Sequence, residues 1–187
     1  MILLVGLGNP TPDSENNRHN VGFKIIDSIN KKFSLSKQKP KFKGLLTTGN
    51  IEGNKVYAIK PLTFMNNSGI CIRELLEYFK IDVGDVIVFH DDLDVEFGKI
   101  KTKFGGSSAG HNGIESIDKF IGKDYSRVRI GIGKPTGKIE ISDYVLQNFN
   151  EDEIVGIDSI LEFINNSLGI LIQKKLDLFS SNVNNKK

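Results

Sequence analysis

The chain has 187 residues, of which 39% are hydrophobic and 26% are charged, a composition typical of a soluble globular protein. This length suits one domain, because a single core usually serves up to roughly 200–250 residues. The net charge of +2 is too small for a protein that coats nucleic acid, so any anion site must come from local clustering. The single cysteine, Cys71, cannot form an internal disulfide, which fits a reducing cytoplasm.

The first half of the chain alternates between strand and helix patterns. Residues 2–7 form an apolar run that is typical of a buried strand and is too short for a membrane span. An apolar residue at every fourth position predicts a helix over about 21–33. Two β-rich runs within 43–61 predict a hairpin, and apolar spacing at 72–79 predicts a second helix.

The middle of the chain continues the same alternation. A continuous apolar run over 85–92 ends in acidic residues, and residues 99–104 alternate as a strand should. A loop rich in glycine and serine, 105–110, leads into a third predicted helix. Residues 127–133 are predicted to form another strand.

The C-terminal part is predicted to be helical. Asn150 and Glu153 have the spacing of a capping box, and apolar residues follow at intervals of three and four. We expect Gly169 to break or kink this helix. Residues 181–187 have the composition of a disordered tail, so we expect one domain over residues 1–180.

These elements predict the α/β fold class: a single domain with a twisted, mixed and largely parallel sheet that is flanked by helices. In such folds ligands bind at the carboxyl ends of the strands. Three polar segments follow predicted strands, namely Gly8-Asn9-Pro10, His90-Asp91-Asp92 and Gly133-Lys134-Pro135. A functional site is therefore expected where these segments meet.

Three familiar chemistries fit the sequence poorly. The run "VGLGNPT" has two glycines of a dinucleotide-binding loop, but Thr11 stands at the third position and no suitable acid follows. The run "HDDLD" could suggest a metal site, yet His90 and Asp91 should point to opposite faces of a strand. Cys71 has no nearby base and no nucleophilic serine motif is present, so a covalent acyl-enzyme lacks a nucleophile.

His19 and Asp91 remain as a candidate base and its orienting group. A carboxylate that binds one ring nitrogen of a histidine fixes the tautomer and leaves the other nitrogen free to accept a proton from water. A lone histidine before a helix is more often structural, however, so position alone leaves both interpretations open.

Basic residues alternate along two predicted strands. Lys99, Lys101 and Lys103 share one face of the first, and Arg127 and Arg129 share one face of the second. Such a row could contact phosphate, or it could protect an edge strand against aggregation. The spacing alone favours neither of these two roles.

Six segments together resemble the bacterial peptidyl-tRNA hydrolase family. They are "VGLGNP" (5–10), "RHNVG" (18–22), "PLTFMNNSG" (61–69), "VFHDDLD" (88–94), "GGSSAGHNG" (105–113) and "RVRIGIGKP" (127–135). They occur in the order and spacing of the family over residues 1 to about 146, and six motifs in register are far more specific than one glycine loop. The C-terminal helices match in pattern more than in letters.

The resemblance implies hydrolysis of the ester that joins a peptide to tRNA, which recycles tRNA from stalled translation without a metal or organic cofactor. It implies that His19 is the catalytic base and that Asp91 holds it. It also implies substrate contacts and basic positions that bind tRNA phosphate: Asn9, Phe64, Met65, Asn66 and Asn112 for substrate, Lys101, Lys103 and Arg129 for phosphate. A monomeric cytoplasmic enzyme is expected, with peptidyl-tRNA as its partner and with no membrane and no obligate protein partner.

The loop before His19 departs from the pattern of the family. Thr11, Ser14 and Asn17 stand where the family usually has glycine, tyrosine and threonine. Ser14 keeps only the hydroxyl of the tyrosine, so we expect it to be at most a weak substrate contact. The alternative to an enzyme is a non-catalytic RNA-binding relative of the same fold, against which the intact histidine, aspartate and asparagine set argues.

Overall fold

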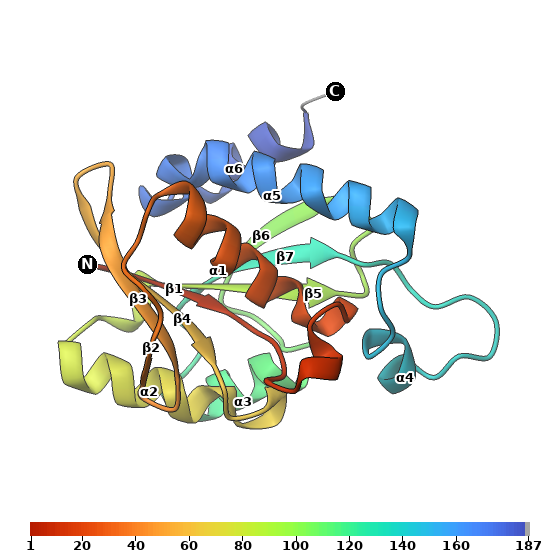
Figure 1. Ribbon diagram of the computed structural model, residues 1–187, viewed down its shortest axis with the longest axis horizontal. Coiled ribbons are helices and arrows are strands. Elements are labelled where there is room, and N and C mark those ends of the chain that lie inside the picture. Colours follow the sequence, from red (N-terminus) through yellow and green to blue (C-terminus); the bar gives the residue numbers. More distant parts are fainter. Residues whose placement is uncertain (186–187) are drawn as a thin grey trace.

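A computed structural model, which describes residues 1–185, has a seven-stranded sheet with helices on both faces (Figure 1). The four central strands are parallel to one another, and the outer three are antiparallel to their neighbours. Across the sheet the order is β2 (Lys39–Lys41), β3 (Gly44–Ile51), β4 (Asn54–Pro61), β1 (Ile2–Gly6), β5 (Val86–Asp92), β7 (Ser126–Gly131) and β6 (Ile100–Phe104). The predicted single α/β domain with a mixed sheet is confirmed.

The helices divide between the two faces of the sheet. On one side lie α1 (Val21–Lys32), α5 (Glu151–Ile172) and α6 (Leu176–Asn184). On the other lie α2 (Ser68–Phe79) and α3 (Asn112–Ile121), which pack on a second apolar cluster. Because both faces are covered, the central strands are apolar throughout rather than alternating.

Two structural features differ from the predictions for the C-terminal part. Gly169 does not break α5, which continues to Ile172. A Cβ at position 169 would lie 2.0 Å from a carboxylate oxygen of Glu52, so the glycine makes room for a neighbour inside a regular helix. The expected tail is also wrong for residues 181–184, which form the last turn of α6 and include the buried Val183. Residues 186–187 of that predicted tail lie outside the described residues.

The long helix α5 is unusually apolar. By length and composition alone it could cross a membrane, with a mean hydropathy of 1.4. Its apolar stripe is instead buried in the core, where Ile157, Ile160, Ile164 and Leu168 contact the α1 side of the sheet. The capping box of Asn150 and Glu153 is present as predicted. We therefore interpret α5 as a core helix.

Short elements that the sequence did not predict surround the carboxyl ends of the strands. A 3-10 turn, η2 (Arg18–Asn20), leads directly into α1, and a second, η3 (Met65–Asn67), precedes α2. A five-residue helix, α4 (Ile141–Val145), follows a long loop after β7 (Figure 1). These pieces carry several of the polar side chains at this end of the sheet, among them His19 and Asn20 on η2.

Candidate active site

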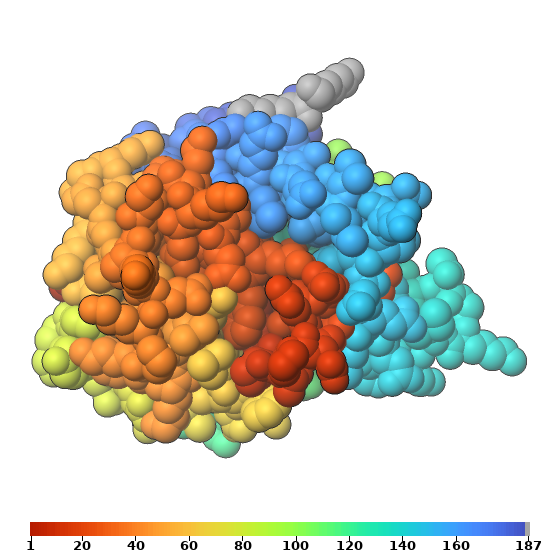
Figure 2. Space-filling model, viewed as in Figure 1, coloured from red at the N-terminus to blue at the C-terminus, as the bar shows by residue number. Residues whose placement is uncertain are grey.

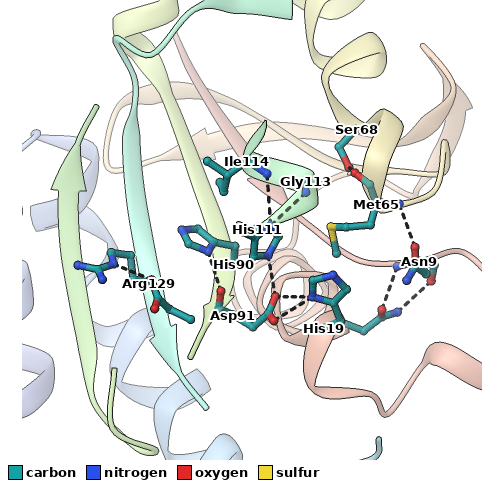
Figure 3. A network of polar contacts seen from close by, with 12 residues as sticks. Asn9, His19, Met65, Ser68, His90, Asp91, His111, Gly113, Ile114 and Arg129 are labelled. Carbon is teal, nitrogen blue, oxygen red and sulfur yellow. Dashed lines mark hydrogen bonds and ion pairs between the residues drawn. The ribbon is translucent and has the colours of Figure 1, made fainter. Parts of the chain in front are cut away.

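His19 and Asp91 meet at the carboxyl end of β5. Nδ1 of His19 lies 2.9 Å from both carboxylate oxygens of Asp91 (Figure 3). Since an ionised carboxylate can only accept hydrogen bonds, Nδ1 carries a proton, and in the neutral form of the ring Nε2 keeps its lone pair. The strand end positions the acid and η2 positions the base, so both come from rigid elements rather than from long loops.

A second histidine, His111, binds the same carboxylate. Its Nε2 lies 2.9 Å from Oδ1 of Asp91. Its Nδ1 accepts hydrogen bonds from the backbone N–H groups of Gly113 and Ile114, which makes His111 the N-cap of α3. Because Nδ1 accepts, Nε2 must be the protonated nitrogen that donates to Asp91. The sequence alone did not identify His111 as a site residue, although it lies in the segment 105–113, directly before Asn112.

The environment favours the charged form of Asp91. Burial alone would raise its pKa, but electrostatic interaction with His19 and His111 and the hydrogen bonds that both rings donate outweigh this effect and hold the pKa well below its ordinary value. Asp91 is therefore a buried carboxylate at neutral pH, shared between two imidazole N–H donors. His19, His111 and Asp91 each offer one ligand atom within 4.8 Å of the others, but in this arrangement a ring nitrogen of each histidine already binds the Asp91 carboxylate.

His90 points to the opposite face from Asp91, as predicted. Its Nδ1 donates to the backbone carbonyl of Asp91 over 2.8 Å, and its ring packs edge-on against His111. Burial, assisted by the nearby His111, lowers the pKa of His90 to about 3. His90 is thus a neutral residue beneath the site.

Asn9 is held in place by its neighbours. Its backbone exchanges two hydrogen bonds with the side chain of Asn20, both 2.9 Å long. Its side-chain oxygen accepts the backbone N–H of Met65, also over 2.9 Å. Since that oxygen is occupied, the amide nitrogen of Asn9 is the group left to meet a ligand. Figure 3 shows His19 between Asp91 on one side and Asn9 on the other.

Arg18 links η2 to the C-terminal part of the chain. Its guanidinium donates to both carboxylate oxygens of Glu153, at 3.2 and 3.0 Å, and lies 4.3 Å from the centre of the Tyr144 ring. Glu153 also closes the capping box of α5, and Tyr144 belongs to α4. The residue before His19 therefore couples η2 to two distant helices, a link that sequence spacing does not reveal.

A cavity of about 400 Å³ opens beside His19 and Asp91, and we call it the catalytic cavity. The loop before α3, the segment after β5 and the inner side of α4 form its walls. Residues that line it include Asp92, Ser108, His111, Asn112, Lys134 and Val145. The cavity lies on the β5 and β7 side of His19.

The remaining residues implied for substrate binding have different environments. Met65 is buried and Asn112 is exposed on the first turn of α3. Phe64 is 53% exposed and Asn66 is exposed on η3. Ser14 is buried, and its hydroxyl lies 2.7 Å from that of Thr11. A weak substrate contact by Ser14 stays a prediction.

The basic residues lie together along β6 and β7. Lys101 pairs with Arg129 and Lys103 with Arg127 across the antiparallel ladder, which places all four on one face. Lys101 and Lys103 are exposed. Arg129 donates to Asp92 over 2.8 Å, and Arg127 is buried and donates to the carbonyls of Gly105 and Ser107. We call Lys101, Lys103 and Arg129 the basic edge.

The glycines of "VGLGNP" have a packing role. A Cβ on Gly6 would lie 2.2 Å from the backbone oxygen of Gly22, and one on Gly8 would lie 2.7 Å from the ring of Phe23. These glycines let α1 approach the end of β1 closely. This packing accounts for the glycines of the motif, so nucleotide binding is not needed to explain them. Cys71 is fully buried, and burial raises its pKa to about 12, so it supplies no thiolate at neutral pH.

Comparison with known proteins agrees with this geometry. The family model described as peptidyl-tRNA hydrolase matches residues 3–187. The peptidyl-tRNA hydrolase of Pelagibacter ubique is 76% identical over all of both chains, and that of Ehrlichia canis is 45% identical over 98% of this chain and 94% of its own.

Solved structures agree as well. The crystal structure of peptidyl-tRNA hydrolase from Acinetobacter baumannii has a TM-score of 0.92 and 34% identity, covering 100% of this chain and 96% of its own. A hydrogenase maturation protease from Thermococcus kodakarensis, at 14% identity and a TM-score of 0.51, shares the fold alone. These matches support the interpretation of the chain as a hydrolase over the alternative of a non-catalytic RNA-binding protein. The chain belongs to the peptidyl-tRNA hydrolase family, whose members hydrolyse the ester between peptide and tRNA.

Proposed function

We propose that the catalytic cavity is where this chain hydrolyses the ester of peptidyl-tRNA, with His19 as the general base. The observation that carries the proposal is the contact between Nδ1 of His19 and Asp91, which leaves Nε2 unprotonated beside the cavity. A water molecule that donates to Nε2 becomes a stronger nucleophile as it approaches the ester carbonyl. The buried Asp91 carboxylate stabilises the imidazolium that forms as the proton moves.

His111 and Asn20 act as positioning residues in this proposal. His111 holds the second side of the Asp91 carboxylate, so the acid cannot rotate away from His19. Asn20 holds the backbone of Asn9 in the same way. Preorganised donors contribute most to catalysis when they need no reorganisation during the reaction.

The free amide nitrogen of Asn9 is the proposed donor to the substrate near the ester. An amide can bind a carbonyl without adding charge, and in a partly buried site it can also stabilise the developing oxyanion. We propose that Asn66 and Asn112 position the substrate, with Phe64 and Met65 on the same side as Asn9.

The basic edge is the proposed contact for tRNA phosphate. Lys101 and Lys103 offer exposed ammonium groups, whereas Arg129 is already paired with Asp92 and would contribute through its remaining N–H groups. We further propose that the enzyme works as a cytoplasmic monomer without metal, organic cofactor or obligate protein partner. In support, one chain supplies all the residues assigned above, and the substrate is a product of translation.

Release of peptide from a purified peptidyl-tRNA tests the proposal. His19→Ala should lower kcat by at least about 10²- to 10⁴-fold, the usual contribution of a general base. Lys55→Ala, an exposed residue on the β3–β4 hairpin, is the control and should behave as the parent protein. Circular dichroism should show an unchanged fold for both variants.

Two results would count against the proposal. Undiminished turnover by a correctly folded His19→Ala variant would remove His19 from the mechanism. Binding of peptidyl-tRNA by the parent protein without any release of peptide would favour the non-catalytic alternative.

A further inference from the structure

A second group of lysines lies at the other edge of the sheet. The segment "KQKPKFK" (37–43) contains four lysines and no acidic residue, so it carries +4, whereas the net charge of the whole chain is +2. Its residues 39–41 form β2, which lies at the opposite edge of the sheet from β6. With six strand spacings of about 4.8 Å between them, the two edges are roughly 29 Å apart. The lysines of β2 are therefore separate from the basic edge.

Lys39 and Lys41 project to the face of the sheet that α2 covers. Across the β2–β3 ladder Lys39 lies opposite Leu46 and Lys41 lies opposite Gly44, and opposed residues share a face. Leu46 belongs to the apolar cluster on which α2 packs. Figure 2 shows the orange β2 segment at the surface of the molecule, beside the yellow-green α2. Both lysines are exposed, as is Lys37 just before the strand, so this row of cations faces solvent.

Aromatic rings surround the ammonium group of Lys41. Its Nζ lies 4.5 Å from the ring centre of Tyr78, 5.0 Å from that of Phe42 and 5.6 Å from that of Phe79. Tyr78 packs against both neighbouring rings, with centres 5.2 Å from Phe42 and 4.9 Å from Phe79, yet it is 62% exposed. A flat aromatic ring is thus held in place at the surface, next to the row of cations.

The hairpin turn that carries Phe42 has an unfavourable backbone conformation. Phe42 and Lys43 have φ angles of 53° and 56°, in the left-handed region where glycine or asparagine usually stands in a two-residue hairpin turn. Bulky residues rarely adopt this region, and such outliers cluster at functional sites. The turn brings the ring of Phe42 against Tyr78 and Phe79 at the end of α2. The side chains of this turn therefore contribute to the surface at a cost to the backbone.

The acidic residues nearby already have partners. Glu74 pairs with Lys43, and a carboxylate oxygen of Glu77 lies 3.9 Å from Nε of Arg73. Within residues 1–185, the three lysines on and just before β2 form no ion pair. Their positive charge is therefore available to an anionic partner.

We propose that Lys37, Lys39, Lys41, Phe42 and Tyr78, which we call the lysine–aromatic surface, bind single-stranded RNA other than the tRNA that is being hydrolysed. Proteins that bind single strands combine cations along the backbone with aromatic rings on which bases stack. Alternate side chains of a strand are about 6.6 Å apart, which is comparable with the distance between neighbouring phosphates of an extended nucleic acid strand. A base can stack on Tyr78 while the lysines contact the flanking phosphates. Such binding is independent of the chemistry at His19.

Two other roles account for less of this surface. Lysines on an edge strand oppose pairing with another sheet, but that role needs no aromatic ring beside them. An anionic membrane would also attract lysines, but surfaces that bind membranes present apolar side chains that insert between lipids. Here the exposed ring belongs to a tyrosine, whose hydroxyl is polar. The combination of free cations and a fixed tyrosine ring favours RNA.

Fluorescence anisotropy with a short, unstructured and labelled RNA of uridine and cytidine tests the proposal. Every protein in this titration carries Lys101→Gln and Lys103→Gln, so that the basic edge does not contribute to binding. The affinity is measured over a series of salt concentrations. Circular dichroism of each protein should show an unchanged fold.

The charges are tested by Lys39→Gln combined with Lys41→Gln. This pair should weaken RNA binding in low salt and reduce the slope of log affinity against log salt by about 1.4, or about 0.7 for each lost phosphate contact. Lys31→Gln combined with Lys32→Gln is the matched control, because it removes the same charge from α1 on the opposite face of the sheet. The control should leave the slope unchanged.

The aromatic ring is tested by two substitutions of Tyr78. Tyr78→Ala should weaken RNA binding by about tenfold at every salt concentration, because one base loses its stacking partner. Tyr78→Phe keeps the ring and should bind RNA as the parent protein does. Polyglutamate is a polyanion without bases, so its affinity should fall in the double lysine variant but not in Tyr78→Ala.

Peptide release shows whether the surface serves the substrate tRNA. In the otherwise native chain, Lys39→Gln combined with Lys41→Gln should keep the kcat and KM of the parent protein for peptidyl-tRNA. A rise in KM that parallels the loss of RNA affinity would overturn the proposal, because the lysine–aromatic surface would then bind the tRNA that is being hydrolysed.

Three further results would overturn the proposal. One is an RNA affinity that changes neither in the double lysine variant nor in Tyr78→Ala. Another is an effect of the lysines alone, equal for RNA and polyglutamate, which would leave only the protection of an edge strand. The third is tighter binding to phosphatidylserine vesicles than to RNA, which would make this a membrane surface. His19→Ala should bind the RNA as the parent protein does, so a failure of the catalytic proposal is seen separately.

Discussion

The buried network around Asp91 and the basic edge on β6 and β7, both of which we propose to act on the same substrate, are built in opposite ways. Asp91 is 2% exposed, and two histidines bind it at 2.9 Å. Lys101 and Lys103 are exposed, and solvent and salt screen their charges. A buried charge depends on each partner, whereas exposed charges contribute small and nearly independent amounts. Changes in the network should therefore affect the rate strongly, and changes at the edge should affect affinity weakly.

Asp91→Asn should test the network most severely. An asparagine amide can donate to Nδ1 of His19, which would move the proton to Nε2 and block the base. We expect kcat to fall by about 10²- to 10⁴-fold with little change in KM, measured by single-turnover release of peptide. Asp92→Asn is the matched control, because it lies next along β5 and binds Arg129 instead. Equal losses of kcat in both variants would show that a carboxylate at the strand end, rather than the tautomer of His19, is what matters.

Two substitutions of His111 should separate its two contacts. Asparagine is a good N-cap but is too short to reach Asp91, whereas glutamine can reach Asp91 but caps poorly. His111→Asn should thus lower kcat by about tenfold while keeping the melting temperature. His111→Gln should keep more of kcat and lose about 1 kcal/mol of stability. If kcat follows the melting temperature in both variants, then His111 supports the fold only.

The sequence predicted the elements that follow strong local patterns. The helix at 21–33, the hairpin at 43–61 and the strand at 85–92 are present within a few residues. Short pieces such as α4 and β2 have no period to recognise, and tertiary contacts stabilise them. The break predicted at Gly169 is wrong because the glycine makes room for Glu52, a contact from a distant part of the sequence that local spacing does not show.

The site could be predicted only in part. His19 and Asp91 emerged from strand ends and family motifs, and the structure brings them together at 2.9 Å. His111 was missed because its function depends on which nitrogen caps α3, which no spacing rule gives. Arg18 was missed because its partner Glu153 lies 135 residues away in the chain. The contact between the hydroxyls of Ser14 and Thr11 was not predicted either, because local spacing does not show which polar groups pair within a loop.

Because of His90, the free energy of unfolding should decrease in mild acid. Its pKa is about 3 in the folded protein because of burial, against an ordinary value of 6.5. As pH falls from about 6.5 toward 3, the unfolded chain takes up a proton that folded His90 refuses, so the free energy of unfolding decreases. The lowered pKa of Asp91 has the same sign, but its contribution is lost only below about pH 4.

Urea denaturation between pH 4.5 and 7.5, a range above the one in which Asp91 contributes, provides the measurement, and comparison with a His90 variant isolates the part due to His90. His90→Asn can still donate to the carbonyl of Asp91 but does not titrate. We expect this variant to be less stable at pH 7.5 and to lose less stability on acidification than the parent protein. Parallel stability curves for the two proteins would contradict a titrating His90.

Lys103→Ala should have the smallest effect and test the exposed side of the comparison. Loss of one phosphate contact should weaken tRNA binding severalfold in low salt and reduce the slope of log affinity against log salt by about 0.9. The rate of ester hydrolysis at saturating substrate should not change, since Lys103 lies on β6, which β7 separates from Asp91 on β5. Lys55→Ala on the distant hairpin should leave both quantities unaltered. The side chain of Lys103 lies against the loop before α3, since a Cβ added to Gly106 would be 2.5 Å from its Nζ. A change in kcat without a change in the salt slope would therefore mean that Lys103 acts through this loop. The basic edge would then belong to the catalytic network rather than to a separate electrostatic surface.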